Sequence, residues 1–301
     1  MARNSSGTAT AYKVAGIGEI LWDIFPDGRK LGGAPANFSY VAHALGSEAY
    51  PVSAVGIDED GYEIRKVLKN LKLSDNYILE DQRHETGQVE VILSQEGVPG
   101  YVIKENVAWD YLELTDALLK LAESLNAVCF GTLAQRNHIS RNTIRNFIGK
   151  VPGDHIRLLD INLRLEYYDT EIIEQSLELC NWLKLNDQEL KTVSDLFGFT
   201  GSMDQCLQKL LDRFNLKLIA LTLGAKGSRL ITGQIDHGLG TESIAVKDTV
   251  GAGDAFSATL VTAALAGHPH TICHVKSAEM ASFLCQNFGA TPPIPSKYKL
   301  I

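Results

Sequence analysis

Apolar and polar positions along this chain repeat in two patterns, one typical of buried strands and one typical of amphipathic helices. Short runs rich in Val, Ile and Leu predict strands at 14–20, 51–55, 127–131, 156–161, 182–185 and 218–223. Apolar residues at helical spacing predict helices at 36–45, 62–71, 115–124, 140–149, 170–179, 187–196, 203–213, 253–266 and 271–287. Turn residues between short β segments predict one hairpin from 88–94 and 100–104 and another within 228–246.

The order of these segments indicates an α/β fold. From position 114 onward, strands and helices alternate, and this order is typical of a parallel sheet with helices packed on its faces. The hairpin at 88–104 interrupts the alternation. Since the sequence has no fixed-period repeat and no low-complexity linker, we expect one α/β domain with a small β excursion positioned to cover a site.

Composition and charge narrow the classes of partner. The chain has 301 residues, of which 45% are hydrophobic and 21% are charged, a balance typical of a globular protein. Its 28 basic and 36 acidic residues give a formal net charge of -8, which argues against nucleic acid or an anionic membrane surface as the main partner. Five cysteines without a Cys-x-x-Cys pair indicate reduced, mostly buried thiols rather than disulfides or a zinc site: Cys129, Cys180, Cys206, Cys273 and Cys285.

The first twelve residues are small and polar, so we expect a disordered tail rather than a secretory signal. No later stretch is long and apolar enough to span a membrane. Together with the reduced cysteines, these features favour a cytoplasmic protein without a membrane partner.

The segment 248–254, with the sequence DTVGAGD, joins small residues to a carboxylate at the start of a predicted helix. The amides of Gly251, Ala252 and Gly253 can approach an anion closely, and the helix that follows adds the positive end of its dipole. Asp254 then lies where a carboxylate can accept a proton from an attacking hydroxyl. An alternative stays open, because an Asp near a helix start often serves only as a cap.

Two other patterns carry less weight. Gly16-x-Gly18 begins like a dinucleotide-binding fingerprint, but the third glycine is absent and no helix follows directly, so a nicotinamide cofactor is not favoured. His268, His270 and His274 are close in sequence, but they have no accompanying acidic pair and do not indicate a metal site.

The segment 32–37 (GGAPAN) precedes a predicted helix, and together with 248–256 (DTVGAGDAF) it closely resembles the two signature regions of the ribokinase/PfkB family of sugar kinases. Further segments resemble the family in order and spacing: 56–61 (GIDEDG), 160–164 (DINLR), 186–189 (NDQE) and 222–227 (TLGAKG). The resemblance covers nearly the whole chain. It implies a ribokinase-like three-layer α/β core with a central, mostly parallel sheet. It also implies that 1–301 is a single domain with a small β lid, whose strands come from about 22–32 and 86–106.

The resemblance implies an ATP-dependent kinase that transfers the γ-phosphoryl group to a sugar hydroxyl. It assigns Asp254 as the catalytic base, and the amides of Gly251, Ala252 and Gly253 as the anion hole for the γ-phosphate. ATP and Mg²⁺ are the implied cofactors.

For the sugar, the resemblance points to Asp23, Gly33, Asn37, Asn162 and Arg164. Carboxylates and amides that face one pocket can bind vicinal hydroxyls, and Gly33 leaves room for the substrate. Asn162 and Arg164 follow a predicted strand end, where parallel sheets bind their ligands. Simpler alternatives stay open: a surface turn for Asp23, a helix N-cap for Asn37 and an exposed loop for Arg164.

For the nucleotide, the resemblance points to Asn186, Thr222, Gly224 and Gly227. Glu189 would reach Mg²⁺ through water, because this ion keeps much of its hydration shell. Asn186 and Glu189 also have the spacing of a helix capping box, and the two roles are compatible.

Asp248 matches a position near which several family members bind K⁺, so the resemblance implies a monovalent-cation site there. A carboxylate beside Thr249 is equally common as a turn former, and this alternative stays open.

Two segments, 97–110 and 130–134, resemble the fructokinase-like branch of the family, as does Gly18-Glu19. This favours conversion of fructose to fructose 6-phosphate. Ribose, 2-keto-3-deoxygluconate, another ketose or a nucleoside stay open as substrates, and so does a catalytically idle sugar- or nucleotide-binding protein on the same fold.

The lid region raises two further alternatives. Trp109 either stacks on a sugar face or anchors the lid. Apolar residues on the lid strands either form a homodimer interface or pack on the core, namely Val91, Leu93, Val102 and Ile103.

Overall fold

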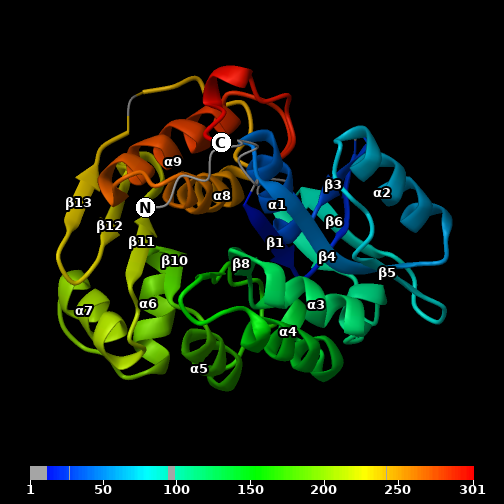
Figure 1. Ribbon diagram of the computed structural model, residues 1–301, viewed down its shortest axis with the longest axis horizontal. Coiled ribbons are helices and arrows are strands. Elements are labelled where there is room, and N and C mark those ends of the chain that lie inside the picture. The colour runs from blue at the N-terminus through cyan, green and yellow to red at the C-terminus, as the bar shows by residue number, and fades with distance from the viewer. Residues whose placement is uncertain (1–11, 27, 94–98, 242) are drawn as a thin grey trace, which may run out of the picture.

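The strands of this protein pair into one large sheet and one small sheet, and helices cover the large one (Figure 1). This computed structural model describes residues 12–26, 28–93, 99–241 and 243–301. The tail expected at 1–12 therefore lies outside the described residues except for Tyr12.

The large sheet has nine strands in the order β13-β12-β11-β10-β9-β8-β1-β4-β5. The seven strands from β11 to β5 are parallel, and β12 and β13 at one edge are antiparallel. Their bounds are β1 Lys13–Ile17, β4 Glu48–Gly56, β5 Ile78–Asp81, β8 Ala127–Phe130, β9 Ile156–Asp160, β10 Trp182–Asn186, β11 Leu218–Thr222, β12 Ser228–Ile231 and β13 Asp236–Leu239. The predicted central, mostly parallel sheet is confirmed.

Helices pack on both faces of this sheet and bury its apolar side chains in two clusters. One cluster includes residues of α1, α2, α8 and α9, and the other includes residues of α3 to α7, as Figure 1 shows for the two layers. The helices are α1 Ala34–Ala44, α2 Glu59–Asn70, α3 Asp116–Ser124, α4 His138–Lys150, α5 Thr170–Leu179, α6 Asp187–Leu196, α7 Met203–Arg213, α8 Ala252–Leu265 and α9 His270–Cys285. This arrangement confirms the three-layer α/β fold, and it explains why central strands such as β8 are apolar throughout.

The small sheet, which we call the lid, has four strands in the order β3-β2-β6-β7. Its strands are β2 Leu21–Phe25, β3 Gly28–Gly32, β6 Gly87–Leu93 and β7 Pro99–Ile103. The β2–β3 and β6–β7 pairs are antiparallel hairpins, and β2 pairs with β6 in parallel. Val102 is exposed and Ile103 is buried, while the side chains of Val91 and Leu93 lie outside the described part of the chain.

The structure differs from the predicted elements in three places. β1 ends at Ile17 rather than at 20, because the chain turns at Gly18 and enters the lid. The last hairpin ends at Leu239 rather than at 246. The strand β5 was not predicted, because only its first residue is fully buried and its sequence, ILED, gives a weak apolar signal.

The strand order reverses beside β1, and this reversal determines where a ligand can bind. The chain runs from β1 outward to β4 and β5, then returns to β8 on the other side of β1 and continues outward to β11. In open α/β sheets, the crevice at such a switch point, outside the carboxyl ends of the strands, is the usual ligand site. A ligand site is therefore expected beyond Ile17, Phe130 and Asp160, which end β1, β8 and β9.

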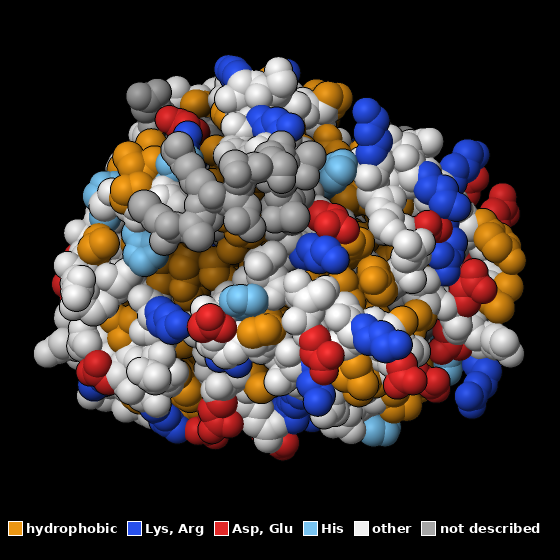
Figure 2. Space-filling view, viewed as in Figure 1, with side chains coloured by type: hydrophobic (Ala, Val, Ile, Leu, Met, Phe, Trp, Pro, Cys, Tyr) orange, Lys and Arg blue, Asp and Glu red, His pale blue; other side chains and the backbone are white. Residues whose placement is uncertain are grey.

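The mixed charges on the surface (Figure 2) and the free, mostly buried cysteines agree with what the composition predicts. Figure 2 shows basic and acidic side chains interspersed over the face in view. All five cysteines are free, and four of them are buried. Among the described residues, no helix has both the length and the apolar character needed to cross a bilayer.

Candidate active site

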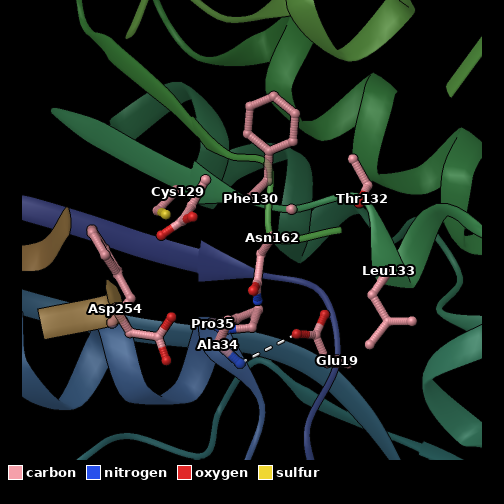
Figure 3. A pocket seen from close by; sticks show the side chains of 12 residues that line it. Glu19, Ala34, Pro35, Cys129, Phe130, Thr132, Leu133, Asn162 and Asp254 are labelled. Carbon is pink, nitrogen blue, oxygen red and sulfur yellow. Dashed lines mark hydrogen bonds between the residues drawn. The ribbon is translucent and has the colours of Figure 1, made fainter. Parts of the chain in front are cut away.

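A pocket lies at the switch point, between the carboxyl ends of the central strands and the first turns of α1 and α8 (Figure 3). Residues that follow β1, end β9 or begin the two helices contribute polar groups to its wall: Glu19, Asp160, Asn162 and Asp254. In Figure 3 the carboxyl groups of Glu19 and Asp254 flank the start of α1 from opposite sides. The pocket thus gathers three carboxyl groups and one amide from distant parts of the sequence.

Asp254 lies in the first turn of α8 and reaches across to α1. Its Oδ2 accepts a hydrogen bond of 2.8 Å from Nδ2 of Asn37. The N-cap residue of α8 is Gly251, so Asp254 does not occupy the cap position that the simpler interpretation gave it. Burial raises the pKa of Asp254 to about 6, and the nearby Asp160 carboxylate adds to this shift, while the bond from Asn37 opposes it.

Gly251, Ala252 and Gly253 form the turn into α8. Gly251 has a left-handed backbone with φ of 77°, and a Cβ there would lie 2.5 Å from Cβ of Ala290, so only glycine fits. The first N–H groups of a helix have no partners within the helix and carry the positive end of its dipole. Within the described residues, the N–H of Ala252 donates a hydrogen bond of 3.3 Å to the carbonyl oxygen of Thr249, while the N–H groups of Gly251 and Gly253 have no hydrogen-bond partner. The turn therefore presents an anion-binding end beside the carboxylate of Asp254.

The GGAPAN segment begins α1 beside the pocket, with Ala34 and Pro35 in its wall and Asn37 bonded to Asp254. Gly33 is the N-cap residue of α1 with φ of 106°, and a Cβ on it would lie 2.4 Å from the carbonyl oxygen of Glu19. Since Gly33 is the N-cap, the alternative of Asn37 as a cap is wrong. Within the described residues, the buried Oδ1 of Asn37 has no hydrogen-bond partner. It is therefore available to a ligand hydroxyl.

Besides Asp254, burial raises the pKa of Glu19, Asp23 and Glu189. Glu19 is almost fully buried, and its Oε1 accepts a hydrogen bond of 3.2 Å from the backbone N–H of Ala34. Burial raises the pKa of Glu19 to about 7. Asp23, on lid strand β2, has its pKa raised to about 6, also by burial, and the charges of Arg164 and Lys30 oppose that shift. Asp23 is half-buried in a strand, so the alternative of a surface turn is wrong.

Asn162 and Arg164 lie in the loop after β9. Asn162 has φ of 41°, a left-handed conformation that asparagine tolerates better than most residues, and it lines the pocket. Arg164 is exposed, and its positive charge lowers the pKa of Asp254, Glu19 and Asp23. The guanidinium is thus a cation that acts on all three of these carboxyl groups.

The residues predicted for the nucleotide lie on the next two strands. Asn186 ends β10 and Thr222 ends β11, and the two are direct partners in the sheet register. Gly224 begins a 3₁₀ turn, Gly224–Lys226, and Gly227 closes it, in the exposed loop after β11. The structure therefore places these residues along the same carboxyl edge as the pocket, on the side away from α1.

Asn186 and Glu189 form the capping box that their spacing predicted. Oδ1 of Asn186 accepts a hydrogen bond of 2.8 Å from the N–H of Glu189, and Oε2 of Glu189 accepts one of 2.8 Å from the N–H of Asn186. Oε1 of Glu189 also accepts a bond of 3.0 Å from the N–H of Leu163. The carboxylate therefore ties the loop after β9 to the start of α6.

Asp248 lies at the other end of the DTVGAGD segment. Its Oδ1 accepts a hydrogen bond of 3.0 Å from Val250, and its Oδ2 accepts one of 2.9 Å from Gly289, both from backbone N–H groups. Nζ of Lys30, on lid strand β3, lies 3.7 Å from Oδ2. Asp248 is therefore a turn former that also faces an ammonium group.

Trp109 and His274 are buried and make contacts within the fold. Trp109 is fully buried with the guanidinium of Arg136 stacked 4.1 Å from its ring centre, so it anchors the lid connection rather than facing a sugar. His274 is buried, and its Nε2 lies 2.8 Å from Oγ of Ser228. Nδ1 of His274 lies 2.9 Å from Nδ1 of His237.

A model of the "pfkB family carbohydrate kinase" matches residues 27–297. The chain belongs to this family. The carbohydrate kinase is 29% identical over 270 residues to a sugar kinase of Pyrococcus horikoshii, a match that covers 84% of this chain and 82% of that protein. It is also 29% identical over 263 residues to fructokinase of Escherichia coli, covering 83% of each chain.

Solved structures share the fold of this carbohydrate kinase. The P. horikoshii sugar kinase, solved in complex with ATP, superposes with a TM-score of 0.77 at 27% identity and covers 92% of this chain and 94% of that one. A double mutant of fructokinase of Vibrio cholerae, solved with fructose, ADP and potassium ion, gives a TM-score of 0.80 at 22% identity over 98% of this chain and all of that one. The ribokinase-like fold and the sugar-kinase activity are therefore established.

No individual role was predicted from the sequence for three polar residues at this site of the carbohydrate kinase: Glu19, Asp160 and Lys184. Glu19 lines the pocket, and Asp160 forms a buried ion pair with Lys184, with 2.9 Å between Oδ1 and Nζ. Glu19 and Asp160 were recognised only as parts of family-like segments. Lys184 carried one signal that could have found it, because it is the one charged residue of the strand WLKLN, in which three of the other four residues are apolar.

Proposed function

We propose that this carbohydrate kinase transfers the γ-phosphoryl group of ATP to fructose and forms fructose 6-phosphate. The observation that carries the proposal is the Asp254 carboxylate, which is hydrogen-bonded to Asn37 of the GGAPAN segment and lies in the first turn of α8, next to Gly251, Ala252 and Gly253. The Asp254 carboxylate thus lies between the segment proposed to bind the sugar and the turn proposed to bind the phosphate.

In the proposed reaction, a bond forms between a sugar oxygen and the γ-phosphorus. The bond between that phosphorus and the oxygen bridging it to the β-phosphate breaks, and ADP leaves with the bridging oxygen. The hydroxyl proton passes to the carboxylate of Asp254. With a pKa near 6, this carboxylate is ionised at neutral pH yet basic enough to accept the proton.

The remaining residues position the reactants and offset charge. The amides of Gly251, Ala252 and Gly253 bind the oxygens of the transferring group, where phosphoryl transfer needs stabilisation most. On the sugar side, Oδ1 of Asn37 and the carboxyl of Asp23 accept hydrogen bonds from the sugar hydroxyls, and the charge of Arg164 acts on Asp23 and Asp254. Asn162 completes the pocket wall beside Asp254. Asn186, Thr222, Gly224 and Gly227 bind the nucleotide phosphates along the neighbouring strand ends.

The donor set fits a magnesium ion held mainly by phosphates and water. Within the described residues, no group of three His, Cys, Asp or Glu side chains forms a metal cluster. Glu189 is buried with each carboxylate oxygen bound to one backbone N–H, which leaves a second lone pair on each oxygen for a metal-bound water. When bound, Mg²⁺ supplies neutralisation of the triphosphate charge. Asp248 offers a carboxylate for a monovalent cation such as K⁺.

Fructose is favoured by the relatives and by the fructokinase-like segments, including Glu19. The test is a substrate panel at saturating MgATP with ADP formation as the readout. It compares fructose with ribose, 2-keto-3-deoxygluconate, glucose and a nucleoside. We expect kcat/KM for fructose to exceed that of every other compound by about tenfold or more, a difference of about 1.4 kcal/mol in transition-state binding.

The outcomes separate the alternatives. Absence of turnover with fructose, with turnover of another compound, overturns the substrate and keeps the kinase. Tight sugar binding in calorimetry with no ADP formed from any compound indicates an idle binding protein. The product position is checked by ³¹P–¹³C coupling in the phosphorylated sugar, which must appear at carbon 6.

A further inference from the structure

Lys184 is a charged residue in the middle of the central sheet. It lies on β10 and is 8% exposed. A lysine ammonium is costly to bury unless charges and hydrogen bonds replace its water. Its strand neighbours Leu183 and Leu185 are fully buried, so the sheet itself gives no reason for a charge at this position.

Asp160 accounts for part of the compensation. Nζ of Lys184 donates a hydrogen bond of 2.9 Å to Oδ1 of Asp160, its register partner on β9. Oδ2 of Asp160 accepts a bond of 2.8 Å from Oγ of Ser257 on α8. Among the described residues, Asp160 is the hydrogen-bond partner of this ammonium, which has three N–H donors. Two donors therefore remain for a ligand.

The ammonium lies directly against the turn that begins α8. A Cβ built on Gly253 would lie 2.8 Å from Nζ of Lys184, closer than real side chains approach. The space that a side chain at 253 would take is therefore occupied by the ammonium. Glycine at this position has two consequences: it leaves the amides open to an anion, and it gives room to a cation beneath them.

Negative charge predominates around this cation. Asp160 from β9, Glu189 from α6 and Asp254 from α8 all act on Lys184, and together they outweigh the effect of burial and raise its pKa, so the group stays charged. Asp254 itself faces Asp160, Lys184, Arg164, Glu19 and the amide of Asn37. A bound triphosphate adds further negative charge beside these carboxylates. A fixed, buried cation therefore stabilises the transferring group most during the transfer itself.

We propose that Lys184 binds a γ-phosphoryl oxygen of the nucleotide from the sheet side of the Gly251–Gly253 turn, and is thus a catalytic residue of the transfer. This inference rests on the proposed kinase function. The amides of the turn and the ammonium of Lys184 then hold the transferring group between them, while Asp160 and Ser257 hold the ammonium in place.

The test uses Lys184→Met together with the double variant Lys184→Met/Asp160→Asn. The single variant can misfold because it leaves the Asp160 carboxylate buried without its partner. The double variant removes both charges and keeps an acceptor for Ser257. Lys191→Met is the matched control, a lysine exposed on α6 and paired with Asp195. The single variant Asp160→Asn shows how much of the loss in kcat comes from the Asp160 charge alone. We expect the double variant to lose about 10²-fold or more in kcat, with KM for the sugar within about threefold, and Asp160→Asn to lose less.

Nucleotide binding tests the contact without turnover. Calorimetry with MgCl₂ compares ADP with an ATP analogue whose β,γ bridge resists hydrolysis. We expect the double variant to bind the analogue about tenfold more weakly and ADP within about twofold of wild type, because only the analogue carries a γ-phosphoryl group. Equal losses for the two nucleotides, or kcat within about threefold of wild type, would overturn the role of Lys184.

The same measurements distinguish failure of the inference from failure of the proposed function. A wild-type protein that phosphorylates no sugar overturns the proposed function, while the ratio of analogue to ADP affinity still decides the role of Lys184. A wild-type protein that binds neither nucleotide overturns both. As an independent check, Gly253→Ala should lower the Tm of wild type by more than it lowers the Tm of Lys184→Met/Asp160→Asn, since methionine is one atom shorter and leaves space for the new methyl group.

Discussion

At the residue scale, the pocket is built around one carboxylate whose burial opposes its ionisation. Asp254 lies beside Asp160, and both effects raise its pKa to about 6. The hydrogen bond from Asn37 and the charges of Lys184 and Arg164 act in the other direction. The balance leaves a base that is ionised at pH 7 but not strongly stabilised in that form, which is the condition that general-base catalysis requires.

Replacing Asp254 with Asn should therefore separate catalysis from folding. Asparagine can still accept the hydrogen bond from Asn37, but it cannot take the hydroxyl proton. We expect kcat to fall by about 10²- to 10⁴-fold with the KM for sugar nearly unchanged, and the Tm at pH 8 to stay equal or rise, because a buried charge is lost. A near-normal rate with a small loss of stability would instead indicate a purely structural aspartate. Asp195→Asn, on the exposed face of α6, is the control.

The pH dependence of the wild-type reaction follows from the same pKa. The base must be deprotonated to act, so kcat/KM should rise as the pH increases through about 6 and level off above 7. Steady-state rates between pH 5 and pH 8.5, at constant ionic strength, measure this. A rate independent of pH over that range would exclude Asp254 as a base with this pKa.

The hydrogen bond between Asn37 and Asp254 could not be predicted from the local sequence pattern. The two residues are 217 positions apart, and only the family resemblance linked their segments. Glu19 and Asp160 have no local signature, because each looks like an ordinary residue after or at the end of a strand, and the only signal of Lys184 is its charge within a mostly apolar strand. Their meeting depends on the strand order β10-β9-β8-β1, which hydrophobic periodicity does not encode.

At the scale of elements, the lid is attached to the core at the end of β7 by Arg136. This residue follows β8, and it is 7% exposed in its side chain. Nε lies 2.8 Å from Oδ1 of Asp110, and Nη2 lies 2.8 Å from its Oδ2, a bidentate pair. Nη2 also donates to the carbonyl oxygen of Lys104, the residue after β7. The rings of Trp109 and Tyr167 enclose the guanidinium.

Arg136→Met should therefore destabilise the protein strongly. It leaves the buried Asp110 carboxylate without its partner, and breaking such a pair from one side costs about 3–5 kcal/mol. Urea unfolding at pH 7.5 measures this change. The double variant Arg136→Met/Asp110→Asn removes both charges and should recover about half of the loss or more. Equal losses in the single and double variants would show that ring stacking, rather than the ion pair, dominates.

The lid also meets the core through Lys30 on β3, whose ammonium lies 3.7 Å from the Asp248 carboxylate. A monovalent cation at Asp248 would compete with this ammonium. We expect Lys30→Gln to lower the K⁺ concentration for half-maximal turnover by about two- to fivefold, since an exposed pair contributes up to about 1 kcal/mol. The measurement is turnover against K⁺ at constant ionic strength, balanced with tetramethylammonium chloride.

The control for this prediction is Arg29→Gln, which removes the same charge from the same strand but pairs with Asp60 instead of Asp248. An identical K⁺ response in Lys30→Gln and wild type would show that Lys30 does not compete for Asp248. A wild-type enzyme indifferent to K⁺ would remove the monovalent-cation role of Asp248 itself.

Elements were predicted best where their neighbours lie close in sequence. From β9 onward, each strand pairs in the sheet with the strand that precedes it in the sequence, so local periodicity carried the information. The lid strand β2 was missed by periodicity, because its sequence LWDIF continues the apolar run of β1 and only its parallel pairing with distant β6 makes it part of another sheet. Resemblance to the family, not the pattern, placed lid strands near 22–32.

At the scale of the whole molecule, the switch point brings several carboxyl groups together at a cost in stability. Glu19, Asp23 and Asp254 have pKa values of about 7, 6 and 6, each raised by burial above the ordinary value. A carboxyl whose pKa is raised on folding contributes stability that is fully present below its unfolded pKa and is lost as the pH rises through the folded pKa. The site therefore weakens the fold most at neutral and alkaline pH.

Glu19→Gln should remove the largest of these contributions, because Glu19 has the highest pKa of the three and glutamine can still accept the bond from Ala34. As the pH rises from 5 to 8, wild type should lose stability relative to the variant by on the order of 2 kcal/mol. Urea unfolding at half-unit intervals measures the difference. His274, whose pKa is lowered to about 4 by burial, changes both proteins equally and cancels. Parallel curves for the two proteins would mean that Glu19 ionises in the folded protein as readily as in the unfolded chain.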